Sequence, residues 1–273
     1  MVKLIALDLD DTLLGRDGIL SPGNRAALER AVARGVEVAV ATGRAYATTP
    51  EEMRRFPGIR YSITGNGAAI YDQTTDSPVM RRVLPPGAAE QVLAILEGMD
   101  ISYEAFLEGQ AFAQEDYLRQ LDTFMMDGPT QDYVRATRVP VPDILAFVRK
   151  YGNQMDSLAV IPRNMDVKRQ VMNRLKALES VYITTSSPRL VEINHRECTK
   201  QRGLQFLAEL LRIPREETAA FGNADNDAEM LAWAGTGVAV AESTPMCLEA
   251  ADYVTGPYDA DGVADAFQVL FGI

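Results

Sequence analysis

Residues 4–12 read LIALDLDDT, a short apolar segment that runs directly into a cluster of acidic residues. Side chains alternate between the faces of an extended strand, so Asp8 and Asp10 point toward the same small volume while Leu9 points away. Two carboxylates held that close repel each other, and a hard cation such as Mg²⁺ relieves the repulsion. The stretch therefore predicts a buried strand that ends in a metal-dependent phosphoryl-transfer site, with an acidic turn as the structural alternative.

Composition and charge restrict the class of protein. With 273 residues, 47% of them hydrophobic and 24% charged, the chain has the length and composition of a soluble globular protein of about two domains. The sequence has no membrane span and no signal-peptide pattern, so we expect a cytoplasmic protein. A net charge of −11 argues against a nucleic-acid partner. Cys198 and Cys247 have the spacing of neither a disulfide framework nor a zinc site.

A helix and a second strand follow the acidic cluster. Ser21 is an N-cap and Pro22 is the first helical residue, and the mostly apolar residues 36–41 are typical of a buried strand. Such a crossover places the ends of both strands at one edge of a parallel sheet, where open α/β sheets bind ligands. We therefore expect residues 42–44 to lie beside Asp8.

The chain changes character at Pro85-Pro86-Gly87, a cluster typical of domain boundaries. We expect an α/β fold in which residues 1–84 and 191–273 share one parallel sheet and residues 85–190 are an α+β insert. Outside the insert, further strands are expected at 61–64, 68–71, 79–84, 219–221, 238–240 and 252–254, and helices at 200–211, 225–234, 244–251 and 261–270. Within it, helices are expected at 88–98, 115–126, 143–151 and 164–178, and strands at 101–106, 158–161 and 182–185.

Four polar clusters lie where these elements begin or end: Asp8/Asp10/Thr12, Thr42-Gly43, Lys200 and GNADND at 222–227. Each has a role in phosphoryl transfer, which depends on positioning and charge stabilisation. A threonine hydroxyl and a glycine amide bind phosphate oxygens, a lysine adds positive charge, and the last cluster supplies oxygens to a metal. Taken singly, the clusters are equally typical of a turn, a surface lysine or a capped helix. The ordered set favours the functional interpretation.

The ordered motifs resemble those of the haloacid dehalogenase superfamily of phosphatases, specifically its Cof-type class IIB members. The resemblance covers nearly the whole chain. Its main motifs are LDLDDTL at 7–13, ATGR at 41–44, Lys200 and GNADND at 222–227. Secondary likenesses are TGNGAAIYD at 64–72, VEI at 191–193, EML at 229–231 and AADYVT at 250–255.

The resemblance implies a Rossmann-like core, residues 1–84 and 191–273, and an α+β cap, residues 85–190, that selects the leaving group. It implies that Asp8 attacks phosphorus and that Asp10 acts as general acid and then as general base. The phosphate-binding positions that it implies are Leu9, Thr42, Gly43, Lys200 and Asn226. The Mg²⁺ ligands that it implies are Asp8, Asp10, Asn223 and Asp227.

One position departs from the family pattern, because members usually carry aspartate where this chain has Asn223. An amide keeps an oxygen ligand but removes a negative charge, so the affinity for Mg²⁺ is expected to fall unless Asp225 or Asp227 compensates. Two further residues are candidates for substrate contact. Arg44 has a surface ion pair as its alternative role, and His195 has a structural role as its alternative.

These observations predict a Mg²⁺-dependent phosphomonoesterase that acts on a small phosphorylated metabolite, in the first place a sugar phosphate, through an aspartyl-phosphate intermediate. Two other functions stay open. A phosphomutase would return the phosphoryl group to another hydroxyl, and a weakly active phosphate-ligand sensor is suggested by Asn223. We expect no nucleic-acid or membrane partner, and a monomer or homodimer.

Overall fold

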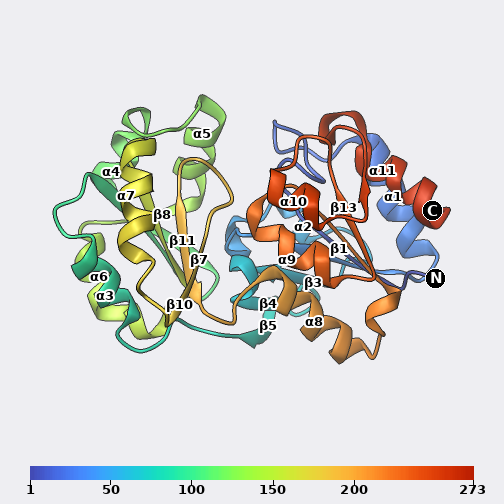
Figure 1. Ribbon diagram of the computed structural model, residues 1–273, viewed down its shortest axis with the longest axis horizontal. Helices are drawn as coiled ribbons and strands as arrows, with labels where there is room; N and C mark the ends of the chain where they lie inside the picture. Colours follow the sequence, from blue (N-terminus) through green and yellow to red (C-terminus); the bar gives the residue numbers. More distant parts are fainter. The chain divides into compact units, whose positions relative to one another are not determined.

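The computed structural model describes residues 1–273 and divides into two compact units, each with its own sheet (Figure 1). The first unit comprises Met1–Gly43, Thr49–Met80 and Thr199–Ile273. The second comprises Arg44–Thr48 and Arg81–Cys198. None of the helices has the length and apolar character that crossing a membrane requires.

The first unit is built around an eight-stranded sheet. Its strands are β1 (Leu4–Leu7), β2 (Glu37–Ala41), β3 (Tyr61–Thr64), β4 (Ala69–Asp72), β5 (Ser77–Arg81), β12 (Thr218–Gly222), β13 (Thr236–Ala239) and β14 (Tyr253–Val254). They lie in the order β14-β13-β12-β1-β2-β3-β4-β5, and neighbours from β14 to β3 are parallel while β4 is antiparallel to β3. The strand that precedes Asp8 is therefore central, between β12 and β2.

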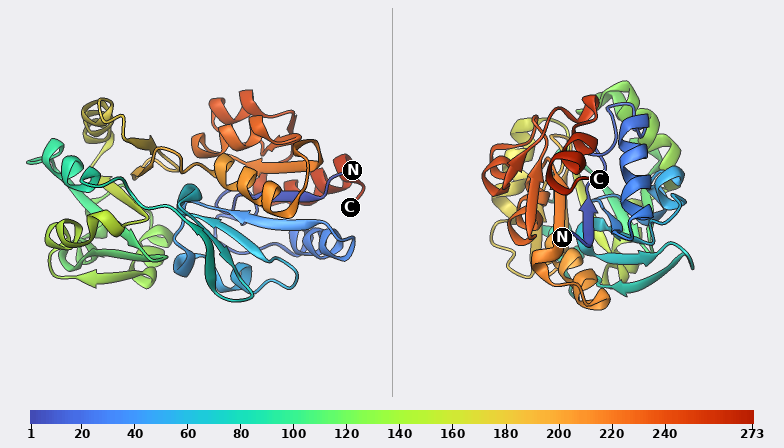
Figure 2. Two further views of the ribbon diagram at one scale, coloured as in Figure 1. Left: turned by 90° about the horizontal axis from the view of Figure 1, so that it is seen from below. Right: turned by 90° about the vertical axis from the view of Figure 1, so that its right-hand side faces the viewer.

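Helices cover both faces of this sheet (Figure 2). They are α1 (Pro22–Ala33), α2 (Glu51–Arg54), α8 (Lys200–Leu211), α9 (Asp225–Trp233), α10 (Pro245–Ala250) and α11 (Gly262–Ala266), which continues as a π-helical turn (Phe267–Phe271). Alternate residues of β1 pack on opposite faces, Leu7 with α1 and α11, and Ala6 with α8 and α9. Burial on both faces explains why β1 and β2 are continuously apolar.

The second unit contains a six-stranded sheet. Its strands are β6 (Ile101–Leu107), β7 (Gln110–Gln114), β8 (Arg138–Val141), β9 (Ser157–Pro162), β10 (Val181–Thr184) and β11 (Val191–His195), in the order β10-β11-β9-β6-β7-β8. All neighbours are antiparallel except β7 and β8. The helices are α3 (Ala88–Ile95), α4 (Glu115–Arg119), α5 (Gly128–Thr137), α6 (Ile144–Tyr151) and α7 (Met165–Leu175). Residues of α3, α6 and α7 pack on one apolar sheet face, whereas those of α4 and α5 pack on the other.

The α/β class is confirmed, but the unit boundaries differ from the expected 84/85 and 190/191. Residues 191–198 lie in the second unit because β11 pairs with both β9 and β10. Residues 44–48 also lie there, and the Ala47 amide donates a hydrogen bond to the Gly109 carbonyl at 2.9 Å. Pairing between distant strands, rather than the proline and glycine cluster, decides where the units divide.

The expected helix 115–126 is wrong in extent, because α4 ends at Arg119 and only a 3₁₀ turn, Leu121–Thr123, follows. The helix α5, which the sequence analysis did not predict, begins after Asp127. The side chain of Asp127 accepts a hydrogen bond from the Thr130 amide, and a proline occupies the first helical turn. A strong N-cap thus begins a new helix inside a segment that was expected to hold one.

Candidate active site

The ends of the parallel strands in the first unit bring several of the predicted site residues to one edge of the sheet. Asp8 follows β1, and its amide donates to the Phe221 carbonyl at 3.0 Å. Thr42 follows β2, and its amide donates to the Ile63 carbonyl at 2.8 Å. These bonds extend the sheet by one residue beyond each strand, so both side chains are held by a rigid backbone.

Lys200 connects two of the four clusters directly. Its Nζ donates to Asp8 Oδ1 and to Asp227 Oδ1, each at 2.6 Å, and the residue is 1% exposed. The lysine is the first residue of α8, where the side chain of Thr199 caps the helix by accepting from the Arg202 amide at 3.1 Å. One buried ammonium therefore joins the end of β1 to the starts of α8 and α9.

Asp227 has hydrogen bonds to both of its carboxylate oxygens. Oδ1 accepts from Lys200, and Oδ2 accepts from the amides of Asn223 and Ala224 at 3.0 Å each. The loop passes so close that a Cβ on Gly222 would come within 2.4 Å of Asp227 Cβ, so only glycine fits there. The carboxylate thereby fixes the loop that carries Asn223.

Negative charge is in excess around the lysine. Burial raises the pKa of Asp8 to about 7, with a further contribution from Asp227, and the nearby Lys200 offsets only part of the rise. Burial by itself would lower the pKa of Lys200, but Asp227 and Asp8 outweigh it and raise that pKa. The ammonium therefore stays charged while the carboxylates compete for it.

The donors at this edge fit a hard cation that keeps part of its water shell. No group of three or more histidine, cysteine, aspartate or glutamate side chains is arranged to hold a metal by itself. Mg²⁺ is typically held by one or two carboxylates together with waters and phosphate oxygens, so a full protein cage is not required. The uncompensated charge that raises the pKa of Asp8 is what a cation would neutralise.

Asn66 is a residue of this edge that the sequence analysis missed as a site candidate. Its Oδ1 accepts a hydrogen bond from Asn226 Nδ2 at 2.9 Å, and its amide donates to the Thr42 carbonyl at 3.1 Å. The backbone of Asn66 is left-handed, with φ of 54°, in the turn after β3. The TGNG motif at 64–67 was visible in the sequence, but its contact with Asn226 depends on the fold.

The first motif presents its residues in different ways. Leu9 is fully buried in the core of the first unit, so only its backbone is available to a ligand. Asp10 is exposed and contributes to the raised pKa of Asp8. Thr12 is fully buried, and its hydroxyl oxygen has no hydrogen-bond partner. An orphaned hydroxyl beside paired acids is consistent with a site that binds polar ligands.

The two candidates for substrate contact belong to the second unit. Arg44 Nη1 donates to the Thr48 carbonyl at 3.2 Å, and its guanidinium lies 4.2 Å from the centre of the Tyr133 ring. His195 Nδ1 accepts from the Glu197 amide at 3.1 Å. Burial and the charge of Arg82 lower the pKa of His195, so the ring is neutral at pH 7 and stabilises a turn.

One cavity of about 620 Å³ lies within the second unit. Its lining includes Leu93, Tyr103, Tyr117, Ile144 and Arg149, and none of the predicted site residues. The largest opening in this unit is therefore separate from the polar clusters that the sequence singled out.

The chain is similar to known proteins over nearly its full length. The model of the haloacid dehalogenase-like hydrolase family matches residues 5–267. The phosphatase YcsE of Bacillus subtilis (strain 168), named for 5-amino-6-(5-phospho-D-ribitylamino)uracil, is 27% identical over 267 residues, 98% of this chain and 95% of that protein. The HMP-PP phosphatase of Serratia proteamaculans (strain 568) is 31% identical over 90% of this chain and 86% of that protein. The solved structure of the subclass IIB sugar phosphatase BT4131 shares the fold, with a TM-score of 0.82, 23% identity and 98% coverage of both chains.

Proposed function

The chain belongs to the haloacid dehalogenase-like hydrolases and is a phosphatase of that family, and we propose that it is a Mg²⁺-dependent phosphomonoesterase that works through an aspartyl-phosphate intermediate. The observation that carries the proposal is the position of Lys200 Nζ, 2.6 Å from both Asp8 and Asp227. A buried ammonium beside a carboxylate nucleophile is suited to stabilise the charge of a transferring phosphoryl group. We expect it to work in the cytoplasm as a monomer or homodimer.

In the proposed reaction Asp8 is the nucleophile and Asp10 is the general acid and base. A carboxylate oxygen of Asp8 attacks phosphorus, the bond to the leaving-group oxygen breaks, and Asp10 donates a proton to that oxygen. Asp10 then removes a proton from the water that attacks the aspartyl-phosphate, which releases phosphate and restores Asp8. Lys200, the Thr42 hydroxyl and the backbone amides of residues 9 and 43 hold the phosphoryl oxygens, and Asn226 with Asn66 fixes the neighbouring loops.

We assign the Mg²⁺ ligands to the Asp8 carboxylate, the Asp10 carbonyl and the Asn223 side-chain oxygen. When bound, the metal would neutralise charge on the phosphate and keep Asp8 ionised. Asp227 was expected as a ligand, but Lys200 and two backbone amides already use its oxygens, so we assign it to positioning of Lys200 and Asn223.

For the substrate we propose a small phosphorylated metabolite with a sugar or polyol chain. YcsE supports this class, because the compound in its name carries its phosphate on a ribityl chain. The second unit is proposed as the cap that contacts the leaving group. A panel of sugar phosphates, polyol phosphates and phosphorylated pyrimidine compounds is the first screen.

Hydrolysis of p-nitrophenyl phosphate tests the proposed function. The wild type should turn over with Mg²⁺ and stop in EDTA, and Asp8→Asn should lower kcat by more than about 10³-fold, since no nucleophile remains. Acid-quenched protein should carry a phosphoryl group in the wild type and none in Asp8→Asn. The exposed Asp122→Asn serves as the matched control. Turnover that continues in EDTA, or an Asp8→Asn variant with unchanged kcat, would contradict the mechanism.

A further inference from the structure

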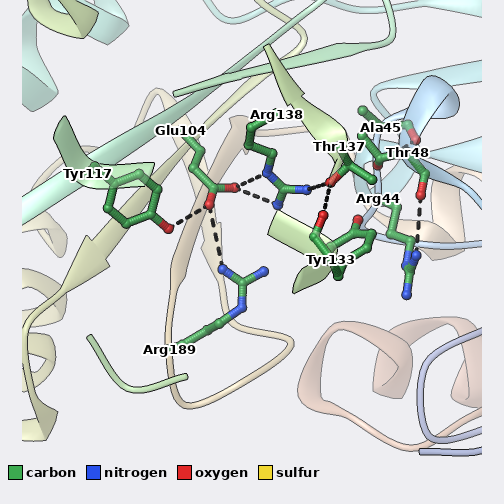
Figure 3. Close-up of polar contacts among 9 residues, drawn as sticks. All are labelled: Arg44, Ala45, Thr48, Glu104, Tyr117, Tyr133, Thr137, Arg138 and Arg189. Carbon is green, nitrogen blue, oxygen red and sulfur yellow. Dashed lines mark hydrogen bonds and ion pairs between the residues drawn. The ribbon is translucent and has the colours of Figure 1, made fainter. Parts of the chain in front are cut away.

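The second unit contains a buried cluster of charged side chains that the proposed chemistry does not use (Figure 3). Its centre is Glu104 on β6, whose side chain is 0% exposed. Oε2 accepts hydrogen bonds from Nε and Nη2 of Arg138 at 2.8 and 2.6 Å, and Oε1 accepts one from the Tyr117 hydroxyl at 2.8 Å. Arg138 and Tyr117 therefore satisfy both oxygens of the carboxylate.

A second arginine lies beside the same carboxylate. Arg189 Nη1 is 3.7 Å from Glu104 Oε1, an ion-pair distance that is too long for a hydrogen bond. This nitrogen is buried and has no hydrogen-bond partner, and the side chain is 13% exposed. Removing a guanidinium from water costs free energy unless its donors find acceptors. Arg189 is therefore short of an acceptor that the protein does not supply.

The turn that carries Arg189 is held firmly. Lys168 Nζ donates to Thr185 Oγ1 and to the Ser187 carbonyl, both at 2.7 Å. The Thr185 hydroxyl lies 3.0 Å from the Leu190 carbonyl. Hydrogen bonds on both sides of the turn fix the backbone from which the guanidinium extends, so its geometry is set before any ligand arrives.

The cluster has a surplus of positive charge. Two guanidinium groups share one carboxylate, and the Tyr133 ring lies 4.9 Å from the Arg138 guanidinium and 4.2 Å from that of Arg44. The next carboxylate on the same sheet face is Glu192. Both Glu104 and Glu192 pair with Ala159, so they are two strand spacings apart, about 10 Å. The surplus is therefore not cancelled within the cluster.

We propose that Arg189, supported by Arg138, forms an oxyanion site in the second unit, whose ligand is a carboxylate or phosphate group of a small metabolite. The guanidinium presents a planar fork of N–H donors that matches two oxygens of such a group. The anion supplies the missing acceptor and balances the charge. It has two possible sources, namely a second acidic group on the substrate or a free anionic effector, and the first of these rests on the proposed function.

Calorimetric titration of the intact protein with malonate tests the site itself. Arg189→Gln should weaken malonate binding by at least about tenfold, because a charge-assisted pair is lost. Arg189→Lys keeps the charge without the fork and should give an intermediate affinity. Arg169→Gln, at a side chain that is 67% exposed, is the control and should bind as the wild type does. Equal malonate affinity in Arg189→Gln and the wild type, or no saturable binding, would overturn the proposal.

A matched pair of substrates separates the two sources. 2-Phosphoglycerate and glycerol 2-phosphate differ by a carboxylate in place of a hydroxymethyl group. If the oxyanion belongs to the substrate, the ratio of their kcat/KM values should fall about tenfold in Arg189→Gln. If it is a free effector, the ratio should stay constant while malonate binding is lost. Hydrolysis of neither compound would count against the proposed function alone, since the malonate titration still decides the anion site.

Discussion

The two buried charge clusters of the molecule have opposite imbalances. In the first unit one ammonium, Lys200, lies between the carboxylates of Asp8 and Asp227. In the second unit one carboxylate, Glu104, lies among the guanidinium groups of Arg138 and Arg189. The first cluster lacks positive charge and the second lacks negative charge. A buried imbalance costs free energy, so each cluster indicates what kind of ligand would complete it.

The pKa shifts follow the same contrast. Burial and Asp227 raise the pKa of Asp8 to about 7, against the opposing effect of Lys200. Burial would also raise the pKa of Glu104, but Arg138 and Arg189 outweigh it and the net shift is downward. The same kind of group in equally buried positions is thus held in opposite ways, by too few and by too many cations. The proposals of a cation at the first cluster and an anion at the second rest on this difference.

Lys200→Met should give the largest loss of stability. It leaves two buried carboxylates with no counter-charge, which should lower the free energy of unfolding by about 3–5 kcal/mol in EDTA. Urea unfolding measures the change, and the exposed Lys176→Met should stay within about 0.5 kcal/mol of the wild type. Equal effects of the two variants would mean that the first cluster is not electrostatically coupled.

Glu104→Gln makes the mirror-image test in the second unit. The amide still accepts hydrogen bonds, but two buried guanidinium groups lose their only close counter-charge, so the free energy of unfolding should fall by about 3 kcal/mol. The measurement is again urea unfolding, with the exposed Glu179→Gln as control. A loss no greater than that of the control would remove the basis for a cation-rich cluster.

The stability of the two clusters should depend on pH with opposite signs. Because the pKa of Glu104 is lowered, its contribution is present above the ordinary value of 4.5 and is lost as the pH falls through the lowered pKa. The difference in melting temperature between the wild type and Glu104→Gln should therefore shrink in acid.

For Asp8 the pKa is raised, so its contribution is present below the ordinary value of 3.8 and is lost as the pH rises through about 7. In EDTA, Asp8→Asn should therefore gain stability relative to the wild type between about pH 4 and pH 8. Thermal unfolding across this range decides both trends. Parallel pH profiles for the two pairs would break the comparison.

Asn223→Asp should give the smallest effect, a tightening of Mg²⁺ binding by about tenfold, because a carboxylate replaces a neutral oxygen ligand. Calorimetric titration of the two proteins measures it, with the exposed Asn173→Asp as control. The same titration tests the sensor alternative. Tight Mg²⁺ binding by the wild type together with ready turnover would dismiss it.

The sequence predicted the first unit more fully than the second, for a physical reason. β1 and β2 are buried on both faces, so their apolar runs stand out, and α1 has both a serine N-cap and a proline in its first turn. β7 and β8 have short, mixed patterns, QAFAQ and RVPV, that no periodicity separates from loops. Their identity as strands depends on pairing across the sheet rather than on their own residues.

The candidate site divides in the same way. Asp8, Lys200 and Asp227 were identified from motifs, and the structure joins them although 192 residues separate the first two. Asn66 and Arg189 escaped notice because nothing in their local sequence marks them. Their importance comes from a partner, or from the lack of one, supplied by distant segments.

The amino-acid sequence by itself determined the α/β class, the family and the residue types that can perform phosphoryl transfer, since these depend on local pattern and on the order of motifs. Only the tertiary structure decided which charge meets which, and so which carboxylate is raised in pKa, which is lowered, and which guanidinium is left without an acceptor. Electrostatic energy depends on distance and burial, and both are set by contacts between residues far apart in the chain.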